Sequence, residues 1–253
     1  MPEIHLASSV LFNLGPIPVT NTILTTWIVM ALIGSFAFLA TRQMALIPQG
    51  LQNVFEGILE ALLGLIEQVT QSRKKAEQFL PFLATFFLFI LIANWLELIP
   101  GVLGGLTIET SHGPSPLFRS ANTDLNTPLA LALISVLGTQ IMGIMTLGFV
   151  RHFGHYLSFR PSFDGLIDCF VGLLHVLGEF SRVISFTFRL FGNIFAGEVL
   201  LIVISYLVPY VAPVPFYALE LFVGFVQALV FMMLTLSFMA AATTDLHAEE
   251  AHR

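Results

Sequence analysis

The sequence contains little charge, and this shortage excludes a water-soluble globular domain. Of its 253 residues, 10% are charged and 56% are hydrophobic, whereas a soluble domain carries about 25% charged residues. Only two lysines are present, beside 25 phenylalanines. The composition therefore predicts a polytopic membrane protein. The net charge of −6 comes from scattered acids, and no basic patch argues for a nucleic-acid partner.

Several catalytic and binding motifs are also missing. The single cysteine, Cys169, excludes an internal disulfide. There is no G-x-x-x-x-G-K-[ST] loop to hold a nucleotide, no H-E-x-x-H zinc motif and no G-x-S-x-G nucleophile elbow. We therefore expect a non-catalytic chain that binds no cofactor, metal or nucleotide. The N-terminus lacks the basic start of a signal peptide, so we expect the mature chain to keep it.

Apolar stretches of helical length predict an all-α fold with about five membrane passes. A helix needs about 20 residues to cross a hydrocarbon core of about 30 Å. Four stretches meet this requirement directly: residues 22–40, 79–99, 128–149 and 216–242. We find no internal repeat and expect a single transmembrane domain over residues 1–253.

A fifth apolar stretch, residues 163–208, is too long for one perpendicular pass. As a single helix it would extend about 69 Å, more than twice the thickness of the hydrocarbon core. It must therefore tilt strongly or break at one of its glycines, and we expect the tilted helix. Its titratable residues are Asp168, His175, Glu179, Arg182, Arg189 and Glu198.

Two connecting segments have distinct compositions. Residues 51–69 place apolar side chains at helical spacing with glutamates on the other side. This pattern predicts an amphipathic helix at the membrane surface, and an ordinary packed helix stays open as an alternative. Residues 101–127 are rich in Gly, Pro, Ser, Thr and Asn, which predicts an irregular loop.

Basic residues are concentrated in the loops of one side. The loops after the first and third spans contain Arg42, Arg73, Lys74, Lys75, Arg151 and Arg160. The loop 101–127 on the other side contains only Arg119. The positive-inside rule therefore places the N-terminal segment 1–21 outside and the tail 243–253 in the cytoplasm.

Arg189 lies inside an apolar run, VISFTFRLFGNIFAGEVLLIVI. An arginine cannot lose its charge there, because its pKa is above about 12. Its insertion at the depth of the bilayer costs at least about 2.5–3.5 kcal/mol. Such a cost is typical of a functional residue, and we expect the activity of the chain to depend on Arg189.

Helical spacing sorts the polar residues around Arg189. His175, Arg182 and Arg189 are seven apart and share one stripe, which Ser185 and Asn193 join. Glu198 faces nearly the opposite way, and Glu179 lies about a quarter turn off the stripe. On the last span, Glu220 and Gln227 are seven apart and share one face.

This arrangement is what a proton path requires. Carboxylates and imidazoles take up and release protons, whereas arginine holds its charge and separates the routes on either side of it. Local interpretations stay open for several members. From spacing alone, Glu198 and Glu220 could equally pair with each other to join two helices or carry protons. A single interior histidine such as His175 is more often a hydrogen-bonded structural residue than a proton carrier. We expect Arg182 to extend to the interface and Asp124 to cap a helix.

Residues 189–198 read RLFGNIFAGE, and this stretch resembles subunit a of the F-type ATP synthase, the stationary membrane subunit beside the rotating c-ring. FVGFVQALVFMMLTLSFM resembles the final helix of that family, with Gln227 at its characteristic glutamine. PFLATFFLFILIANWLELIPG and SANTDLNTPLALAL are also similar to family segments, whereas the first 50 residues match only in general character.

The resemblance implies a role for each polar residue. Arg189 would be the essential arginine that faces the carboxylate of the ring, with Asn193 beside it. Glu198, Glu220 and Gln227 would line or border the outer half-channel. His175 and Glu179 would lie toward the inner half-channel, with Asp124 near them. The last two long helices would form a tilted hairpin against the ring.

The implied function is proton conduction that drives rotation of the ring and ATP synthesis. The implied partners are the c-ring, the peripheral-stalk b subunits and the lipid of a bacterial plasma membrane. Two other classes compete with this interpretation. A self-contained secondary transporter would use Arg189 to bind an anionic substrate, and a structural scaffold would pair its charges internally.

Overall fold

The computed structural model describes residues 8–14, 17–42, 50–99, 107–110, 113–116, 118–148 and 163–243. Within these residues the chain is mainly helical, and five of its helices are long and apolar enough to cross a membrane. These five helices are α1 (Asn21–Thr41), α3 (Arg73–Glu97), α4 (Asn126–Leu147), α6 (Phe163–Leu207) and α7 (Pro213–Ala242). The prediction of an all-α polytopic membrane protein is confirmed.

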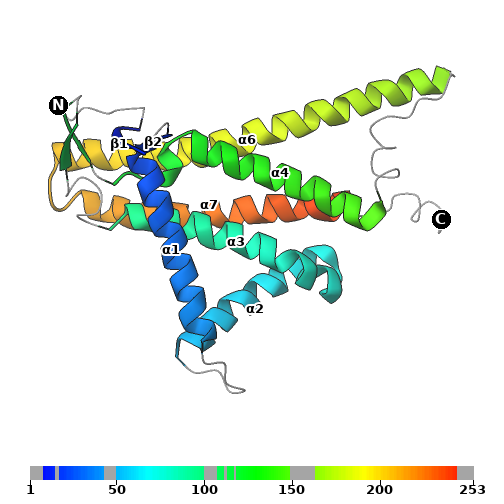
Figure 1. Ribbon diagram of the computed structural model, residues 1–253, viewed down its shortest axis with the longest axis horizontal. Coiled ribbons are helices and arrows are strands. Elements are labelled where there is room, and N and C mark those ends of the chain that lie inside the picture. The colour runs from blue at the N-terminus through cyan, green and yellow to red at the C-terminus, as the bar shows by residue number, and fades with distance from the viewer. Residues whose placement is uncertain are drawn as a thin grey trace.

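Helices α3, α4, α6 and α7 form a bundle, and α1 crosses it at a steep angle (Figure 1). The 21 residues of α1 extend about 32 Å, which matches the hydrocarbon core. The 45 residues of α6 extend about 68 Å without a break. If α1 crosses the membrane along its normal, α6 and α7 must therefore be strongly inclined in it.

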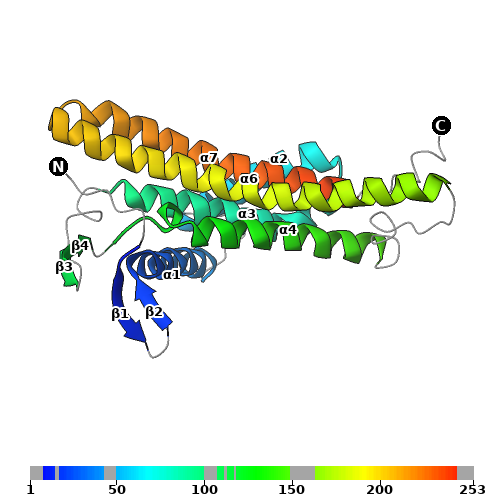
Figure 2. The ribbon, with the colours of Figure 1, turned by 90° about the horizontal axis from the view of Figure 1, so that it is seen from above.

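The last two long helices run side by side over most of the length of α7 (Figures 1 and 2). Pro213 begins α7 at a first-turn position, where its fixed φ suits a helix and its missing N–H breaks no hydrogen bond. The N-terminal part of α6 extends beyond the end of α7, as Figure 2 shows. The two helices thus form the hairpin that the resemblance implied.

The core of the bundle lies around α3. Fully buried members include Phe79, Leu83 and Ile90 from α3, Leu190 from α6 and Leu236 from α7. The ring of Phe231 joins two helices, because its centroid lies 5.4 Å from that of Phe86 and 5.0 Å from that of Phe186. These contacts fix the rotation of α6 and α7, and thereby decide which of their polar side chains face each other.

Short elements connect the long helices. Helix α2 (Leu51–Thr70) covers the predicted amphipathic segment and packs on α3 through Leu62 and Ile66. Two small antiparallel sheets are formed by β1 (Val10–Leu14) with β2 (Ile17–Thr20) and by β3 (Thr107–Thr110) with β4 (Gly113–Pro116). A 3-10 turn, η1 (Ala121–Thr123), precedes α4.

The expectation of a wholly irregular segment over residues 101–127 is wrong for its described part. That part contains the β3–β4 hairpin and η1. The hydroxyl of Ser120 accepts a hydrogen bond from the amide of Asn122, and the hydroxyl of Thr123 donates to the carbonyl of Ser120. Small polar side chains that bond to nearby backbone favour such turns. The cytoplasmic placement of the tail concerns residues that lie almost entirely outside the described part.

Candidate functional site

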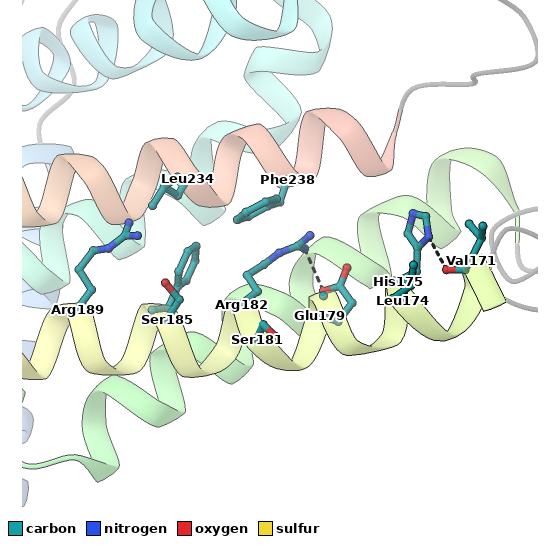
Figure 3. A pocket seen from close by; sticks show the side chains of 12 residues that line it. Val171, Leu174, His175, Glu179, Ser181, Arg182, Ser185, Arg189, Leu234 and Phe238 are labelled. Carbon is teal, nitrogen blue, oxygen red and sulfur yellow. Dashed lines mark hydrogen bonds and ion pairs between the residues drawn. The ribbon is translucent and has the colours of Figure 1, made fainter.

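Arg189 lies in the middle of α6 with its side chain exposed along the bundle. Its neighbours Leu190 and Ile194 are buried in the core, so the packing of α6 turns Arg189 outward. Figure 3 shows its guanidinium extending from α6 toward α7, near Leu234. Among the described residues, no carboxylate lies within ion-pair distance of Arg189.

A groove of about 590 Å³ extends from Arg189 toward the N-terminal end of α6 (Figure 3). One wall comes from α6 and the other from Leu234 and Phe238 of α7. The predicted stripe is confirmed for four of its five members, because His175, Arg182, Ser185 and Arg189 line this groove, whereas Asn193 does not. The polar lining consists of His175, Glu179, Ser181, Arg182, Ser185 and Arg189.

Glu179 and Arg182 form an ion pair inside the groove. The Nη1 atom of Arg182 donates to Oε2 of Glu179 at 2.9 Å, and its Cζ lies 3.5 Å from the ring centroid of Phe238. These contacts do not place a membrane boundary, so the expectation that Arg182 extends to the interface stays a prediction. A carboxylate one turn away and an aromatic face hold the guanidinium within the groove. The ring nitrogen Nδ1 of His175 is bonded to the carbonyl of Val171 at 3.2 Å.

A second polar group, which we call the outer cluster, lies on the other side of Arg189. We define it as Glu97, Arg119, Glu198 and Glu220, which come from α3, the segment before η1, α6 and α7. Nη2 of Arg119 lies 3.7 Å from Oε2 of Glu198. Glu97 interacts electrostatically with the other three, and its carboxylate accepts a hydrogen bond from the Ser120 hydroxyl.

Gly197 brings Glu220 into this cluster. A Cβ atom at position 197 would overlap with the carboxylate of Glu220. Glycine therefore leaves the space that the carboxylate occupies between α6 and α7. By contrast, a Cβ at Gly192 would meet no atom within 4 Å, so within the described part of the chain Gly197 permits a close contact with α7 and Gly192 does not.

Asn193 and Gln227 join α6 to α7 between Arg189 and the outer cluster. Nδ2 of Asn193 donates to Oε1 of Gln227 at 2.9 Å. Gln227 is buried, and its Nε2 atom has no hydrogen-bond partner in the described structure. Glu198 follows Arg189 by nine residues, about 13 Å along the helix. The arginine is therefore separated from the outer carboxylate by one amide pair.

Asp124 lies away from His175 and Glu179, at the opposite end of the bundle. Its Oδ1 accepts hydrogen bonds from the backbone and side-chain amides of Asn126, and its Oδ2 accepts one from Thr22 at 3.1 Å. The local prediction of a helix cap is confirmed in part, because the carboxylate accepts from the first amide of α4 although Leu125 occupies the N-cap position. The placement near the inner residues is wrong, because Asp124 directly follows η1, and Arg119 just before η1 pairs with Glu198 of the outer cluster.

Sequence reasoning missed Glu97 and Arg119 as site residues. Arg119 was visible as the sole basic residue of loop 101–127, and Glu97 as an acid at the end of a predicted span. Neither signal indicates burial, because charged residues at the ends of spans are usually solvated. Only the approach of α3, α6 and η1 brings the two side chains together.

Comparisons with known proteins identify the family. Residues 23–240 match the family model described as "ATP synthase A chain". The chain belongs to this family. It is 34% identical over 236 residues to ATP synthase subunit a of Moorella thermoacetica, covering 93% of this chain and 96% of that protein. It is 36% identical over 243 residues to ATP synthase subunit a of Gloeobacter violaceus, covering 96% and 92%.

Membership in the family agrees with the resemblance that residues 189–198 indicated. A third relative, ATP synthase subunit a of Campylobacter jejuni, is 36% identical over 219 residues, or 85% of each chain. The chain is therefore a multi-pass component of the membrane sector of an ATP synthase, where it works in a complex with other subunits. The matched range contains Arg189, the groove and the outer cluster.

Proposed function

We propose that this chain is the stationary proton-conducting subunit of the ATP synthase. In this proposal it provides two aqueous half-channels to the carboxylates of a rotating c-ring, and Arg189 separates them. The outer cluster borders one half-channel and the groove from Arg189 to His175 forms the other. The chain itself catalyses no covalent chemistry.

The observation that carries the proposal is the state of Arg189. Its charge is permanent, and among the described residues it has no carboxylate partner although it lies in a membrane-spanning helix. A charge at this depth requires a partner. An exposed position on the bundle suits a carboxylate from a neighbouring subunit, such as the one a rotating ring would present.

The mechanism follows from the order of the groups along α6. A proton enters past Glu220 and Glu198 and neutralises a ring carboxylate, which then rotates away through lipid. After nearly a full turn, the carboxylate meets Arg189, loses its proton to the groove and becomes ionised beside the guanidinium. Each charge that crosses 100 mV releases about 2.3 kcal/mol, so a direct proton leak between the routes would waste the driving force.

Two buried amides, one beside the outer cluster and one between that cluster and Arg189, support this assignment. Gln227 Nε2 and Asn122 Oδ1 are buried and have no hydrogen-bond partner in the described structure. Such atoms are normally satisfied by water, which an aqueous route toward Asn193 would supply. In the same proposal Asp124 joins the starts of α1 and α4 and does not conduct protons. Glu179 and His175 receive the proton that leaves the ring.

The membrane orientation is part of the proposal. Basic residues in the loops after α1 and α4 favour a cytoplasmic position for that side of the bundle. The N-terminus then lies outside, the tail lies in the cytoplasm, and the outer cluster opens to the exterior of a bacterial plasma membrane. The proposed partners are the c-ring and the peripheral-stalk b subunits.

A reconstitution experiment separates the proposal from its rivals. The detergent-solubilised chain is expected to co-purify with a small two-helix protein that bears one carboxylate per copy. The isolated chain in vesicles should show no proton or anion flux above that of empty vesicles. Flux of an anionic substrate by the chain alone would instead establish a secondary transporter, and the absence of any ring protein would overturn the proposal.

Replacing Gly197 with alanine tests the contribution of Glu220. The new methyl group displaces the carboxylate, whereas the backbone tolerates the change because alanine favours a helix by about 0.5–1 kcal/mol over glycine. We expect an assembled complex with reduced proton flux, measured by dye quenching in vesicles. Gly64→Ala on α2, where a Cβ meets nothing within 4 Å, is the matched control. Glu220→Asp in the Gly197→Ala background shortens the carboxylate side chain and should restore part of the flux. Equal flux in the wild type, Gly197→Ala, Gly64→Ala and the double variant would contradict a role of Glu220 in proton conduction.

A further inference from the structure

Arg119 is a buried arginine that comes from outside the long helices. It is 5% exposed, and within the described part of the chain it is the only arginine in the buried class. It lies two residues before η1, yet its guanidinium reaches Glu198 on α6 at 3.7 Å. Burial of a permanent charge is expensive unless that charge is paired. The pairing of Arg119 with Glu198 therefore requires an explanation beyond the closing of a loop.

Several polar contacts hold the segment of Arg119 in place. Asn122 donates to Oδ1 of Asn94 on α3 at 2.7 Å, and Asn94 donates to the carbonyl of Gly224 on α7 at 3.1 Å. A Cβ at Gly224 would lie 3.1 Å from Cβ of Asn94, so α3 and α7 are in close contact there. These contacts hold η1 on two long helices and keep the arginine at a fixed position beside α6.

The charges around Arg119 are unequal. Three carboxylates face the cluster, Glu97 from α3, Glu198 from α6 and Glu220 from α7, and in the described structure Arg119 is the only cation among them. More than one ionised carboxylate in such a site is unfavourable without a counter-charge. Of these three described carboxylates, Glu198 is the one within ion-pair distance of Arg119, at 3.7 Å, so the geometry selects Glu198 as the carboxylate that is ionised.

We propose that Arg119 is a positioning residue for proton entry, because it keeps Glu198 ionised between transfers. The inference rests on the proposed function. In each cycle Glu198 takes a proton from water on the outer side and passes it to an ionised carboxylate of the rotor. Only O–H bonds form and break, and Glu198 returns to the ionised state beside Arg119. Glu97 and Glu220 keep their protons while Glu198 changes state.

The test replaces Arg119 with glutamine in the assembled complex and measures proton flux in vesicles as a function of the outer pH. Without its counter-charge, Glu198 holds a proton more tightly and releases it to the rotor more slowly. We expect the maximal flux to fall and the outer pH of half-maximal flux to rise by about one unit or more, the size of effect that an adjacent charge produces.

Two further variants distinguish charge from mere shape. Arg119→Lys keeps the positive charge and should keep the pH of half-maximal flux close to that of the wild type. Arg73→Gln is the matched control, because Arg73 is exposed and also pairs with carboxylates, Glu67 and Glu77. It should change neither the maximal flux nor its pH dependence. A shift of equal size in the lysine and glutamine variants would overturn the proposal.

The decisive comparison uses the Glu198→Gln background. If Arg119 acts through Glu198, adding Arg119→Gln there causes no further loss of flux and no pH shift. An additive loss would overturn the proposal while leaving the half-channels intact, whereas normal flux in Glu198→Gln alone would count against the proposed function itself.

If Arg119→Gln assembles poorly, the double variant should restore assembly, because it removes the unpaired buried carboxylate. Failure to restore it would contradict the inference.

Discussion

We expect a complex with Arg189→Ala to assemble normally and yet to lose both proton-driven ATP synthesis and ATP-driven proton pumping. The side chain is exposed on the bundle and has no ion-pair partner among the described residues, so its removal should change the stability of the fold by about 0.5 kcal/mol or less. Its charge, however, is the only barrier that the proposal places between the two half-channels. Synthesis and pumping in inverted vesicles, normalised to the amount of assembled complex, measure the effect.

The passive proton leak gives a second readout for Arg189. A scaffold role predicts that Arg189→Ala reduces assembly, whereas a gate role predicts intact complex with lost coupling and an unchanged or increased leak. Arg73→Ala is the matched control, because this exposed arginine lies at the start of α3, away from both routes. Normal proton-driven synthesis by the Arg189→Ala complex would refute the assignment of Arg189.

The second large effect is expected from Glu198→Gln. Glutamine keeps the size and the hydrogen-bonding groups of the side chain, but it cannot take up or release a proton. Proton transfer by a positioned side chain contributes about 10²–10⁴-fold to a rate, so we expect at least a tenfold loss of proton flux. Assembly should persist, because the side-chain oxygen of glutamine can still accept a hydrogen bond from Arg119, and the contacts of Asn122 and Asn94 that hold its segment are unchanged.

The control for Glu198→Gln is Glu60→Gln on the exposed face of α2. Both substitutions remove one negative charge, and only the first lies in the outer cluster. Flux driven by an imposed pH gradient in reconstituted membranes compares the two at equal amounts of complex. Undiminished flux in Glu198→Gln, or an equal decrease in both variants, would count against a channel role for Glu198.

Local patterns in the sequence were sufficient for the helices and for one face of the site. The spacing of His175, Arg182 and Arg189 predicted a common stripe, and these residues line one groove. Helical geometry alone gives this result, because it depends on the rise and turn of a single helix. The cap at Asp124 was predictable for the same reason, since its partner Asn126 is two residues away.

Contacts between distant segments could not be predicted in this way. The contact of Arg182 with Phe238 of α7 was not predicted, because the sequence does not say which side chain of α7 lies over its guanidinium. Glu97 and Arg119 were missed because their neighbours come from α6, α7 and η1. The misplacement of Asp124 has the same origin, since its position in the bundle depends on how η1 packs.

The order of residues along the chain by itself determined that this protein spans a membrane, that α6 carries a permanent charge among apolar residues, and which family it belongs to. These properties depend on composition, helical period and motif. Only the tertiary structure decided that Arg119 pairs with Glu198, that Glu220 fits against Gly197 and that Arg189 has no carboxylate within ion-pair distance among the described residues. Packing of the core rotates each helix about its axis, and that rotation determines which polar side chains meet.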